Sequence, residues 1–131
     1  MVCLPIADRS VSHAFYTALG FRRSVDPGED GLPEPLQFQI STGLRLMLIP
    51  RGGFGWVIGG RDDSPSGMHE GQIVVGMPTQ ADVDAFLRRA REAGAQPVYE
   101  AAEQMWGYAG AFIDPDSHQW QVADADSDLT S

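Results

Sequence analysis

Hydrophobic residues in this chain follow two spacings, and the two spacings occur in the same order in each half. A short apolar run at residues 2–6 precedes a helical pattern that starts near Ser10. A second run at residues 72–77 precedes another helical pattern, which starts near Ala81. Short apolar runs are typical of strands, whereas apolar residues spaced three and four apart are typical of helices. The pattern therefore predicts a strand and then a helix in both halves.

Both predicted helices are amphipathic, with one apolar stripe each. The stripe of the first helix contains Val11, Ala14, Phe15, Ala18 and Leu19, and that of the second contains Val83, Phe86, Leu87 and Ala90. Thr79 followed by Asp82 matches the start of a helix with a capping box, and Gly94 matches a C-terminal stop. We expect each stripe to pack against a sheet.

Three further strand-like segments follow each helix. They cover residues 21–25, 35–41 and 44–49 in the first half, and residues 97–100, 108–114 and 119–123 in the second. The predicted fold class is α+β, with two βαβββ modules that pair curved mixed sheets around a concave cavity, because one such module cannot enclose a core alone. We expect one domain over residues 1–123. It would comprise module one at about 1–50, a linker at 51–70 and module two at about 71–123, followed by a flexible acidic tail at 124–131.

Composition and charge favour a folded chain in water. Of its 131 residues 43% are hydrophobic, and no apolar run approaches the roughly 20 residues that span a bilayer. The formal charge is −9 and every basic residue is Arg, so chemistry that depends on Lys is excluded. An acidic surface disfavours nucleic acid, and it either attracts a cationic partner or only aids solubility. We expect a cytoplasmic protein that binds neither nucleic acid nor a membrane.

The reactive side chains form no recognisable catalytic motif. Cys3 is the single cysteine, which excludes an internal disulfide bond. Because Cys3 lies within a predicted buried strand, we expect a small core thiol rather than a nucleophile. No Ser–His–Asp arrangement can be assembled from the spacing of the three histidines.

Aromatic residues are concentrated in predicted loops and strand starts. They are Phe54, Trp56, Trp106 and Tyr108. Such residues either pack against the domain or a dimer partner, or form an aromatic wall for a flat or cationic ligand. Trp120, by contrast, falls on an apolar strand face and is expected in the core.

Several spaced motifs resemble a known superfamily. They are LPIAD at residues 4–8, LGF at 19–21, DVDAF at 82–86, AGA at 93–95, WGY at 106–108 and DPD at 114–116. In this order they resemble the vicinal oxygen chelate superfamily, which includes glyoxalase I, bleomycin-resistance proteins and extradiol dioxygenases. The resemblance covers about residues 1–123. It implies the paired βαβββ fold, frequent homodimers, and a divalent metal bound by four side chains of the concave sheets.

The positions at which the resemblance implies metal ligands carry unusual residues here. They are Met1, Met47, Gln72 and Gln121. Divalent ions prefer carboxylates and imidazoles, whereas a thioether suits Cu(I) and a neutral amide is a weak donor. We therefore expect no divalent metal, and no other cofactor, at these positions.

Strand alternation supports a cavity-facing placement for two of these residues. Met47 shares a predicted strand face with Arg45 and Ile49, and Gln121 shares one with Gln119. The expected pocket is lined by Phe38, Met47, Trp56, Gln72, Trp106, Tyr108 and Gln121.

Three functions remain open from the sequence. The first is a metal-independent protein that binds a cationic or aromatic small molecule, as a homodimer. The second is a metal-dependent lyase, isomerase or dioxygenase that uses ligands outside the family pattern, such as His69 or Glu70. The third is a regulatory or structural dimer without a ligand.

Overall fold

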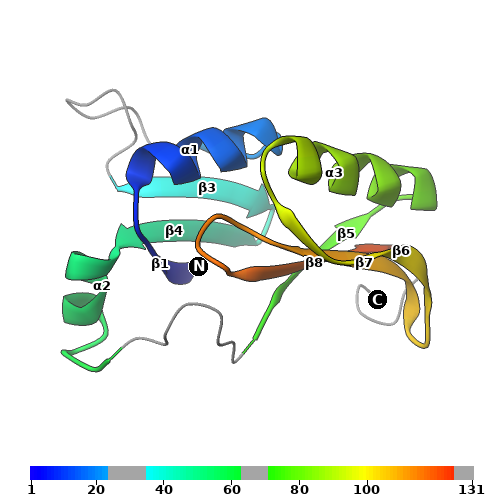
Figure 1. Cartoon of the computed structure of the whole chain (residues 1–131). Coiled ribbons are helices and arrows are strands. Elements are labelled where there is room, and N and C mark those ends of the chain that lie inside the picture. The colour runs from blue at the N-terminus through cyan, green and yellow to red at the C-terminus, as the bar shows by residue number, and fades with distance from the viewer. Residues whose placement is uncertain (24–34, 63–70, 126–131) are drawn as a thin grey trace. The chain divides into compact units, whose positions relative to one another are not determined.

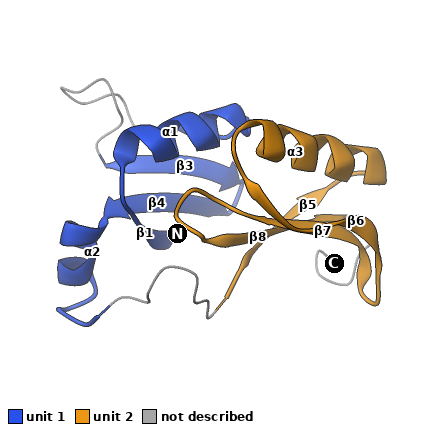
Figure 2. Cartoon of the chain, in the orientation of Figure 1, with its two compact units in different colours: residues 1–65 blue, residues 66–131 orange. Residues whose placement is uncertain are grey.

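A computed structural model describes residues 1–23, 35–62 and 71–125 of the chain. The chain divides into two compact units, here called unit 1 (residues 1–65) and unit 2 (residues 66–131), which Figure 2 shows in separate colours. The described part contains no helix that is both long and apolar enough to cross a bilayer.

Unit 1 contains one helix between strands, as predicted, and a second helix after them (Figure 1). Its elements are β1 (Val2–Ile6), α1 (Arg9–Ala18), β2 (Arg22–Arg23), β3 (Leu36–Ser41), β4 (Leu44–Pro50) and α2 (Arg51–Val57). The four strands form a sheet in the order β1-β4-β3-β2, in which β1 and β4 are parallel.

Unit 2 repeats this arrangement. Its elements are β5 (Ile73–Met77), α3 (Gln80–Glu92), β6 (Gln96–Gln104), β7 (Gly107–Ile113) and β8 (Gln119–Asp124). Its sheet has the order β5-β8-β7-β6, with β5 and β8 parallel. The predicted fold class is confirmed: the protein is α+β and contains two βαβββ modules. The prediction that both modules form one domain stays a prediction.

Strand pairing shows which positions of the two sheets correspond to each other. Cys3 of β1 pairs with Met47 of β4, and Val74 of β5 pairs with Gln121 of β8. The position of Met47 in unit 1 therefore corresponds to that of Gln121 in unit 2. Counting back two residues along β1 and β5, Met1 corresponds to Gln72.

Helix α1 packs on its sheet with a face that differs from the predicted one. Its buried residues are Ser12, Phe15 and Tyr16, followed by Leu19 just after the helix. Val11, by contrast, is 50% exposed, so the predicted stripe was rotated. The aromatic ring of Tyr16 explains the rotation, because it lies 5.1 Å from Phe15 and 5.6 Å from Phe38 of the sheet. An aromatic residue buries more area than an Ala or Val at a competing position.

Helix α3 follows the prediction closely. Val83, Phe86 and Ala90 are buried, and Phe86 lies 6.3 Å from Phe112 of β7. At its start the Thr79 hydroxyl accepts a hydrogen bond from the Asp82 N–H at 3.1 Å, as the capping pattern indicates. At its end Gly94 has a φ of +107°, the left-handed geometry expected of a C-terminal stop.

The turn between β7 and β8 is held by a buried carboxylate. Asp114 is 5% exposed, and its Oδ1 accepts hydrogen bonds from the N–H groups of Asp116 and His118, both at 2.9 Å. Ser117 has a φ of +68°, a conformation that costs about 1 kcal/mol for a residue other than Gly. The Asp114 hydrogen bonds offset that cost, and His118 belongs to this turn.

Two features of unit 1 were not expected from the sequence. The segment predicted as a linker begins with helix α2, which the glycine-rich sequence disfavours but which the buried Phe54 anchors. Cys3 is exposed rather than buried. The reason is strand alternation: Cys3 shares a face with Met47, whereas Leu4 pairs with the buried Leu48 on the opposite face.

Candidate functional site

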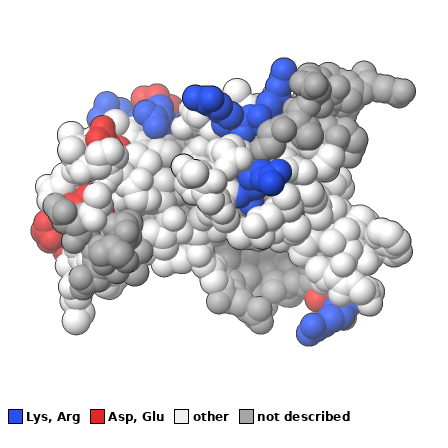
Figure 3. All heavy atoms as spheres, turned by 180° about the vertical axis from the view of Figure 1, so that it is seen from behind, with Lys and Arg blue, Asp and Glu red and all other residues white. Residues whose placement is uncertain are grey.

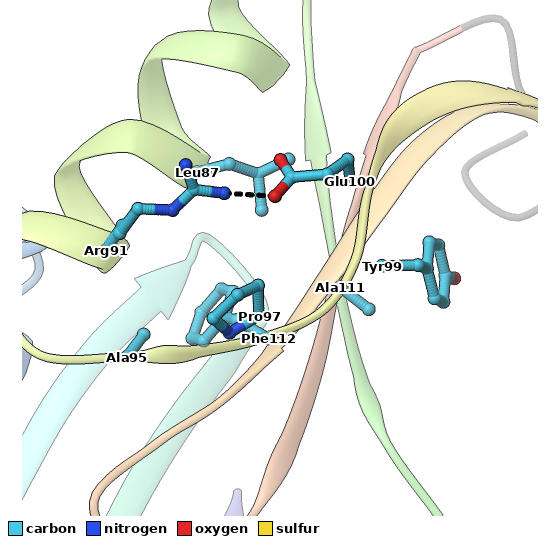
Figure 4. Close-up of a pocket in the computed structure, with 8 residues that line it drawn as sticks. All are labelled: Leu87, Arg91, Ala95, Pro97, Tyr99, Glu100, Ala111 and Phe112. Atoms are coloured by element: carbon cyan, nitrogen blue, oxygen red, sulfur yellow. Dashed lines mark hydrogen bonds and ion pairs between the residues drawn. The ribbon is translucent and has the colours of Figure 1, made fainter.

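The candidate site lies on one face of the unit 2 sheet. Pairing across the sheet places Tyr99, Ala111, Gln121 and Val74 in one row that crosses β6, β7, β8 and β5 in turn. Residues that pair across a sheet project to the same side. The opposite side, which includes Phe112 and Trp120, packs under α3. Figure 4 shows Tyr99 and Ala111 directed away from Leu87 and Arg91 of α3.

Three glutamine side chains on this face form a directed chain of hydrogen bonds. The Gln119 Nε2 donates to the Gln72 Oε1 at 3.1 Å. The Gln72 Nε2 in turn donates to the Gln121 Oε1 at 2.8 Å. We call these three residues the glutamine cluster. Gln72 and Gln121, two of the positions at which the family resemblance implies metal ligands, are therefore hydrogen-bonded to each other.

The buried end of the glutamine cluster has an unused donor. Gln121 is 1% exposed, and within the described residues its Nε2 has no hydrogen-bond partner. A buried donor without a partner costs on the order of 1–3 kcal/mol. Because Gln121 also accepts from Gln72 and lies in the same row as Tyr99, we take it as the centre of the candidate site.

Tyr99 is the aromatic neighbour of the glutamine cluster. Burial raises the pKa of its hydroxyl above the ordinary value, and the nearby Gln121 amide partly offsets this. The interaction falls short of a hydrogen bond of normal geometry, since the Gln121 Nε2 remains unpaired within the described part of the chain.

The corresponding positions in unit 1 carry sulfur. Met47 is half-buried and pairs with Cys3 on one side and with Gln37 on the other. Met1 is 58% exposed. Gln37 is 8% exposed and its Oε1 has no partner among the residues described. This face of unit 1 therefore offers thioethers and a thiol in place of a hydrogen-bonded amide chain.

Two residues predicted to line the pocket belong to the opposite sheet faces. Phe38 is fully buried under α1, where it pairs with Leu46 rather than with Met47. Tyr108 donates a hydrogen bond from its hydroxyl to the Asp84 Oδ1 of α3 at 2.6 Å. Both point toward a helix because strand alternation reverses the face at every residue. We therefore remove Phe38 and Tyr108 from the candidate set.

The other two predicted aromatic residues lie outside the regular core. Trp56 of α2 is 84% exposed. Trp106 lies in the turn between β6 and β7, and its buried indole N–H forms no hydrogen bond within the described segments. Neither tryptophan takes part in the two hydrogen bonds of the glutamine cluster. That Trp56 and Trp106 form an aromatic wall for a ligand stays a prediction.

The ligands suggested for a metal outside the family pattern, His69 and Glu70, lie outside the described residues. Among the residues described, no three His, Cys, Asp or Glu side chains are close enough together to bind one metal ion. The donor set at the family's metal positions in unit 2 consists of neutral amides, which do not fit a divalent ion.

The basic residues of unit 2 all lie on helix α3, although the unit as a whole is acidic. Helix α3 exposes Arg88, Arg89 and Arg91, and arginine side chains stand out on the face drawn in Figure 3. Arg91 forms an ion pair with Glu100 of β6 beside a shallow recess that also contacts Leu87 and Phe112 (Figure 4). Tyr99 and Ala111 also border this recess, whereas none of the three glutamines does.

Comparison with known proteins agrees with this architecture. The model of the Glyoxalase/Bleomycin resistance protein/Dioxygenase superfamily matches residues 1–122. The chain therefore belongs to this superfamily, as its sequence motifs indicated.

A sequence relative and two solved structures illustrate the relationship. Mb0911c of Mycobacterium bovis, a protein described as uncharacterized, is 31% identical over 100 residues, which cover 73% of this chain and 61% of that protein. The hypothetical protein SA1046 of Staphylococcus aureus has a TM-score of 0.80 at 26% identity, covering 95% of this chain and 92% of that one. A glyoxalase-related enzyme from Fulvimarina pelagi has a TM-score of 0.77 at 21% identity, covering 95% and 86%. This chain thus spans less than two thirds of the length of its sequence relative.

Sequence reasoning missed Tyr99 as a site residue. Its strand was predicted only for residues 97–100, whereas β6 extends over Gln96–Gln104 with two register shifts. Strand pairing, which places Tyr99 opposite Ala111, comes from the fold rather than from local sequence. Gln119 could have been included from alternation alone, because it shares a face with Gln121.

Proposed function

We propose that this protein is a metal-independent small-molecule binder of the glyoxalase and bleomycin-resistance superfamily. The single observation that supports this is the hydrogen bond between the exposed Gln72 and the buried Gln121, at two positions where the family resemblance implies metal ligands. The proposal includes a cytoplasmic homodimer, with no role in binding nucleic acid or membranes.

The chemistry of the glutamine cluster disfavours a divalent ion. The Gln121 Oε1 is already an acceptor for Gln72, and the atom left unpaired in the described structure is a nitrogen that carries hydrogens. An amide N–H cannot coordinate a cation, and no carboxylate offsets its charge. A binder needs affinity but no turnover, so it can function without metal-activated chemistry.

Metal content separates this proposal from a metal-dependent enzyme, the alternative suggested by the superfamily's enzymes. Purified protein would be dialysed against Zn²⁺, Ni²⁺ or Fe²⁺ and then against buffer, and its metal content measured. We expect a substoichiometric content for the unmodified chain. The Gln72→His/Gln121→Glu double variant restores the donor types that divalent ions prefer and is expected to retain more metal. Stoichiometric tight binding by the unmodified chain would contradict the proposal.

Ligand binding separates the proposal from a purely structural role. Flat aromatic compounds, both neutral and cationic, would be titrated while the intrinsic Trp fluorescence is recorded. We expect at least one class to bind with saturation. A complete lack of saturable binding across the panel would favour a structural protein.

Trp106 supplies a specific test of the proposed aromatic wall. Its buried and unpaired indole N–H is unusual for a solvated turn residue in the described chain. Trp106→Ala is expected to weaken ligand binding about tenfold. The adjacent Met105 is 99% exposed, so Met105→Ala is the matched control and should leave the affinity unchanged. Equal affinities for both variants would remove Trp106 from the site.

The homodimer is tested separately by sedimentation. Analytical ultracentrifugation of the unmodified chain, which has a mass of 14.2 kDa, should give a species of twice this mass. A monomer at all concentrations would contradict this part of the proposal without affecting the ligand-binding part.

A further inference from the structure

We infer that the ligand is a neutral aromatic molecule that presents a carbonyl oxygen to the Gln121 Nε2. This inference rests on the proposed function and adds the chemical class of the ligand. Three observations support it: the direction of the hydrogen bonds in the glutamine cluster, the position of Tyr99, and the distribution of charge.

The direction of the hydrogen bonds determines which kind of atom the site lacks. Gln119 donates to Gln72, and Gln72 donates to Gln121, so the oxygens of Gln72 and Gln121 both accept already. What remains at the buried end is the Gln121 Nε2, a donor with no partner in the described structure. A ligand that satisfies it must supply an acceptor.

The orientation of the Gln121 amide is set by its neighbour. Rotating this amide alone by half a turn would place its Nε2 against the Gln72 Nε2, which donates at 2.8 Å in the present arrangement. Two N–H groups cannot hydrogen-bond to each other. Only a concerted reversal of all three amides would present an oxygen instead, and that state would select a ligand with a donor.

Tyr99 defines the shape of the ligand. It lies in the same row of the sheet as Gln121, separated by Ala111, whose side chain is a single methyl group. The half-buried Tyr99 ring therefore flanks the same face as the unpaired amide. Aromatic rings favour offset stacking or edge contacts with other planar groups. A flat ligand that contacts Tyr99 would place its carbonyl oxygen at the Gln121 Nε2 by displacing the groups that cover this buried atom.

Charge favours a neutral acceptor over an ionic group. The total charge of −9 opposes an anion, and Gln121 is 1% exposed, so a carboxylate there would lose its hydration for one neutral donor. A cation brings further N–H donors or positive charge to the Gln121 Nε2, which is itself a donor and needs an acceptor. A ketone, amide or quinone oxygen is uncharged and accepts a hydrogen bond, so it suits the Gln121 Nε2.

The test uses four probes with one ring system and different polar groups. They are acetylnaphthalene, naphthoate, naphthylmethylammonium and ethylnaphthalene. Isothermal titration calorimetry with the full chain should show that acetylnaphthalene binds about tenfold more tightly than ethylnaphthalene, the gain expected for one satisfied buried hydrogen bond. In NMR spectra, acetylnaphthalene should shift the side-chain amide signals of Gln121.

Variants connect this selectivity to the glutamine cluster. Gln121→Met keeps a similar volume but removes the donor, and should abolish the difference between acetylnaphthalene and ethylnaphthalene. Gln80→Met removes an exposed amide of α3 that bonds Glu103 at 3.2 Å and should preserve the difference. The NMR measurement on the unmodified chain does not depend on how well either variant folds.

The outcomes separate this inference from the proposed function. Binding of all four probes with equal affinity, or tightest binding of naphthylmethylammonium or naphthoate, would overturn the carbonyl inference and leave the binder proposal intact. Unshifted Gln121 signals on saturation with acetylnaphthalene would also overturn it. Binding of none of the probes would contradict the binder proposal and this inference together.

Discussion

In unit 1, Met47 of β4 lies beside Cys3 of β1, whereas in unit 2 the corresponding positions hold Gln121 and Val74. The two sheets have the same strand order, the same parallel pair and one helix on one face. The side chains on the sheet faces opposite these helices nevertheless differ. Unit 1 carries sulfur atoms at these positions, whereas unit 2 carries a chain of hydrogen-bonded amides. Repetition of the backbone thus conserves the geometry of a site position while leaving its side chain free to change.

The helix-facing sides of the two sheets differ in another way. Leu36 of unit 1 pairs with Leu48, and the corresponding pair in unit 2 is Gly110 with Val122. In unit 2 the space that a side chain at Gly110 would fill is occupied by Leu87 of α3. The space between sheet and helix at this position is therefore filled by Leu36 of the sheet in unit 1 and by Leu87 of the helix in unit 2.

The largest effect is expected from truncating the residue that precedes each site position. Trp120 precedes Gln121, Leu46 precedes Met47, and both are 0% exposed. Trp120→Ala should lower the free energy of unfolding by about 3–5 kcal/mol, and Leu46→Ala by a smaller amount within about 2–5 kcal/mol. Urea unfolding followed by circular dichroism measures both. An equal or greater loss for Leu46→Ala would show that the two cores are not packed as described.

Gly110→Ala tests the contrast between sheet and helix packing. A Cβ at Gly110 would lie 2.5 Å from the Leu87 Cδ1 and 3.0 Å from the Ala101 backbone nitrogen. Leu87 can move but the backbone of β6 cannot, so we expect a loss of about 1–3 kcal/mol in the free energy of unfolding. Gly43→Ala in unit 1 is the control, since its Cβ would meet no atom within 4 Å. Similar urea midpoints for both variants would contradict this packing.

The two helix starts are expected to differ by a smaller amount. The Asp8 Oδ1 accepts from the N–H groups of Ser10 at 2.8 Å and Val11 at 3.2 Å, whereas Thr79 accepts one backbone hydrogen bond. Asp8→Ala should cost about 1–2 kcal/mol of unfolding free energy and Thr79→Ala about 0.5–1 kcal/mol. Thermal unfolding by calorimetry compares them, with the exposed Thr17→Ala as control. The reverse order would contradict the capping geometry.

The smallest effect concerns alkaline pH and is specific to unit 2. The hydrogen bond to Asp84 raises the pKa of the Tyr108 hydroxyl, with further contributions from burial and from the negative charges of Asp84 and Glu103. The protonated phenol is thus favoured by folding. Its contribution is fully present below the unfolded pKa of about 10 and is lost as the pH rises through the folded pKa.

Tyr108→Phe should therefore reduce the dependence of stability on alkaline pH. Urea midpoints at about pH 8 and about pH 11 should differ more for the unmodified chain than for this variant. Tyr99 is present in both proteins, so its raised pKa does not affect the comparison. An identical loss of stability for both proteins would show that the Asp84 contact is absent in solution.

Most of the fold could be predicted from the sequence because its signals are local. Strand alternation, the Thr79 cap and the Gly94 stop all act within a few residues, and the repeated order of elements then indicated two equivalent modules. The exceptions were helix α2, the exposure of Cys3 and the stripe of α1. Small apolar residues such as Ala14 were given the same weight as Tyr16, although only the ring fills the space above the sheet.

The site could be predicted only in part. Gln72 and Gln121 were identified from the family positions, and the structure places them in one hydrogen-bonded pair. Phe38 and Tyr108 were misplaced because their hydrophobic or aromatic character does not reveal which sheet face they occupy. Tyr99 was missed because its neighbour Ala111 is twelve positions away along the chain.

The sequence by itself determined the repeated βαβββ order, the family and the amide character of the unit 2 positions, since each depends on residue identity and near-neighbour spacing. Only the tertiary structure decided that the Gln72 amide donates to Gln121 and that the buried Gln121 Nε2 has no partner among the described residues. The physical reason is that hydrogen-bond direction and burial depend on which strands pair, and β5 and β8 are brought together by a crossover of more than forty residues.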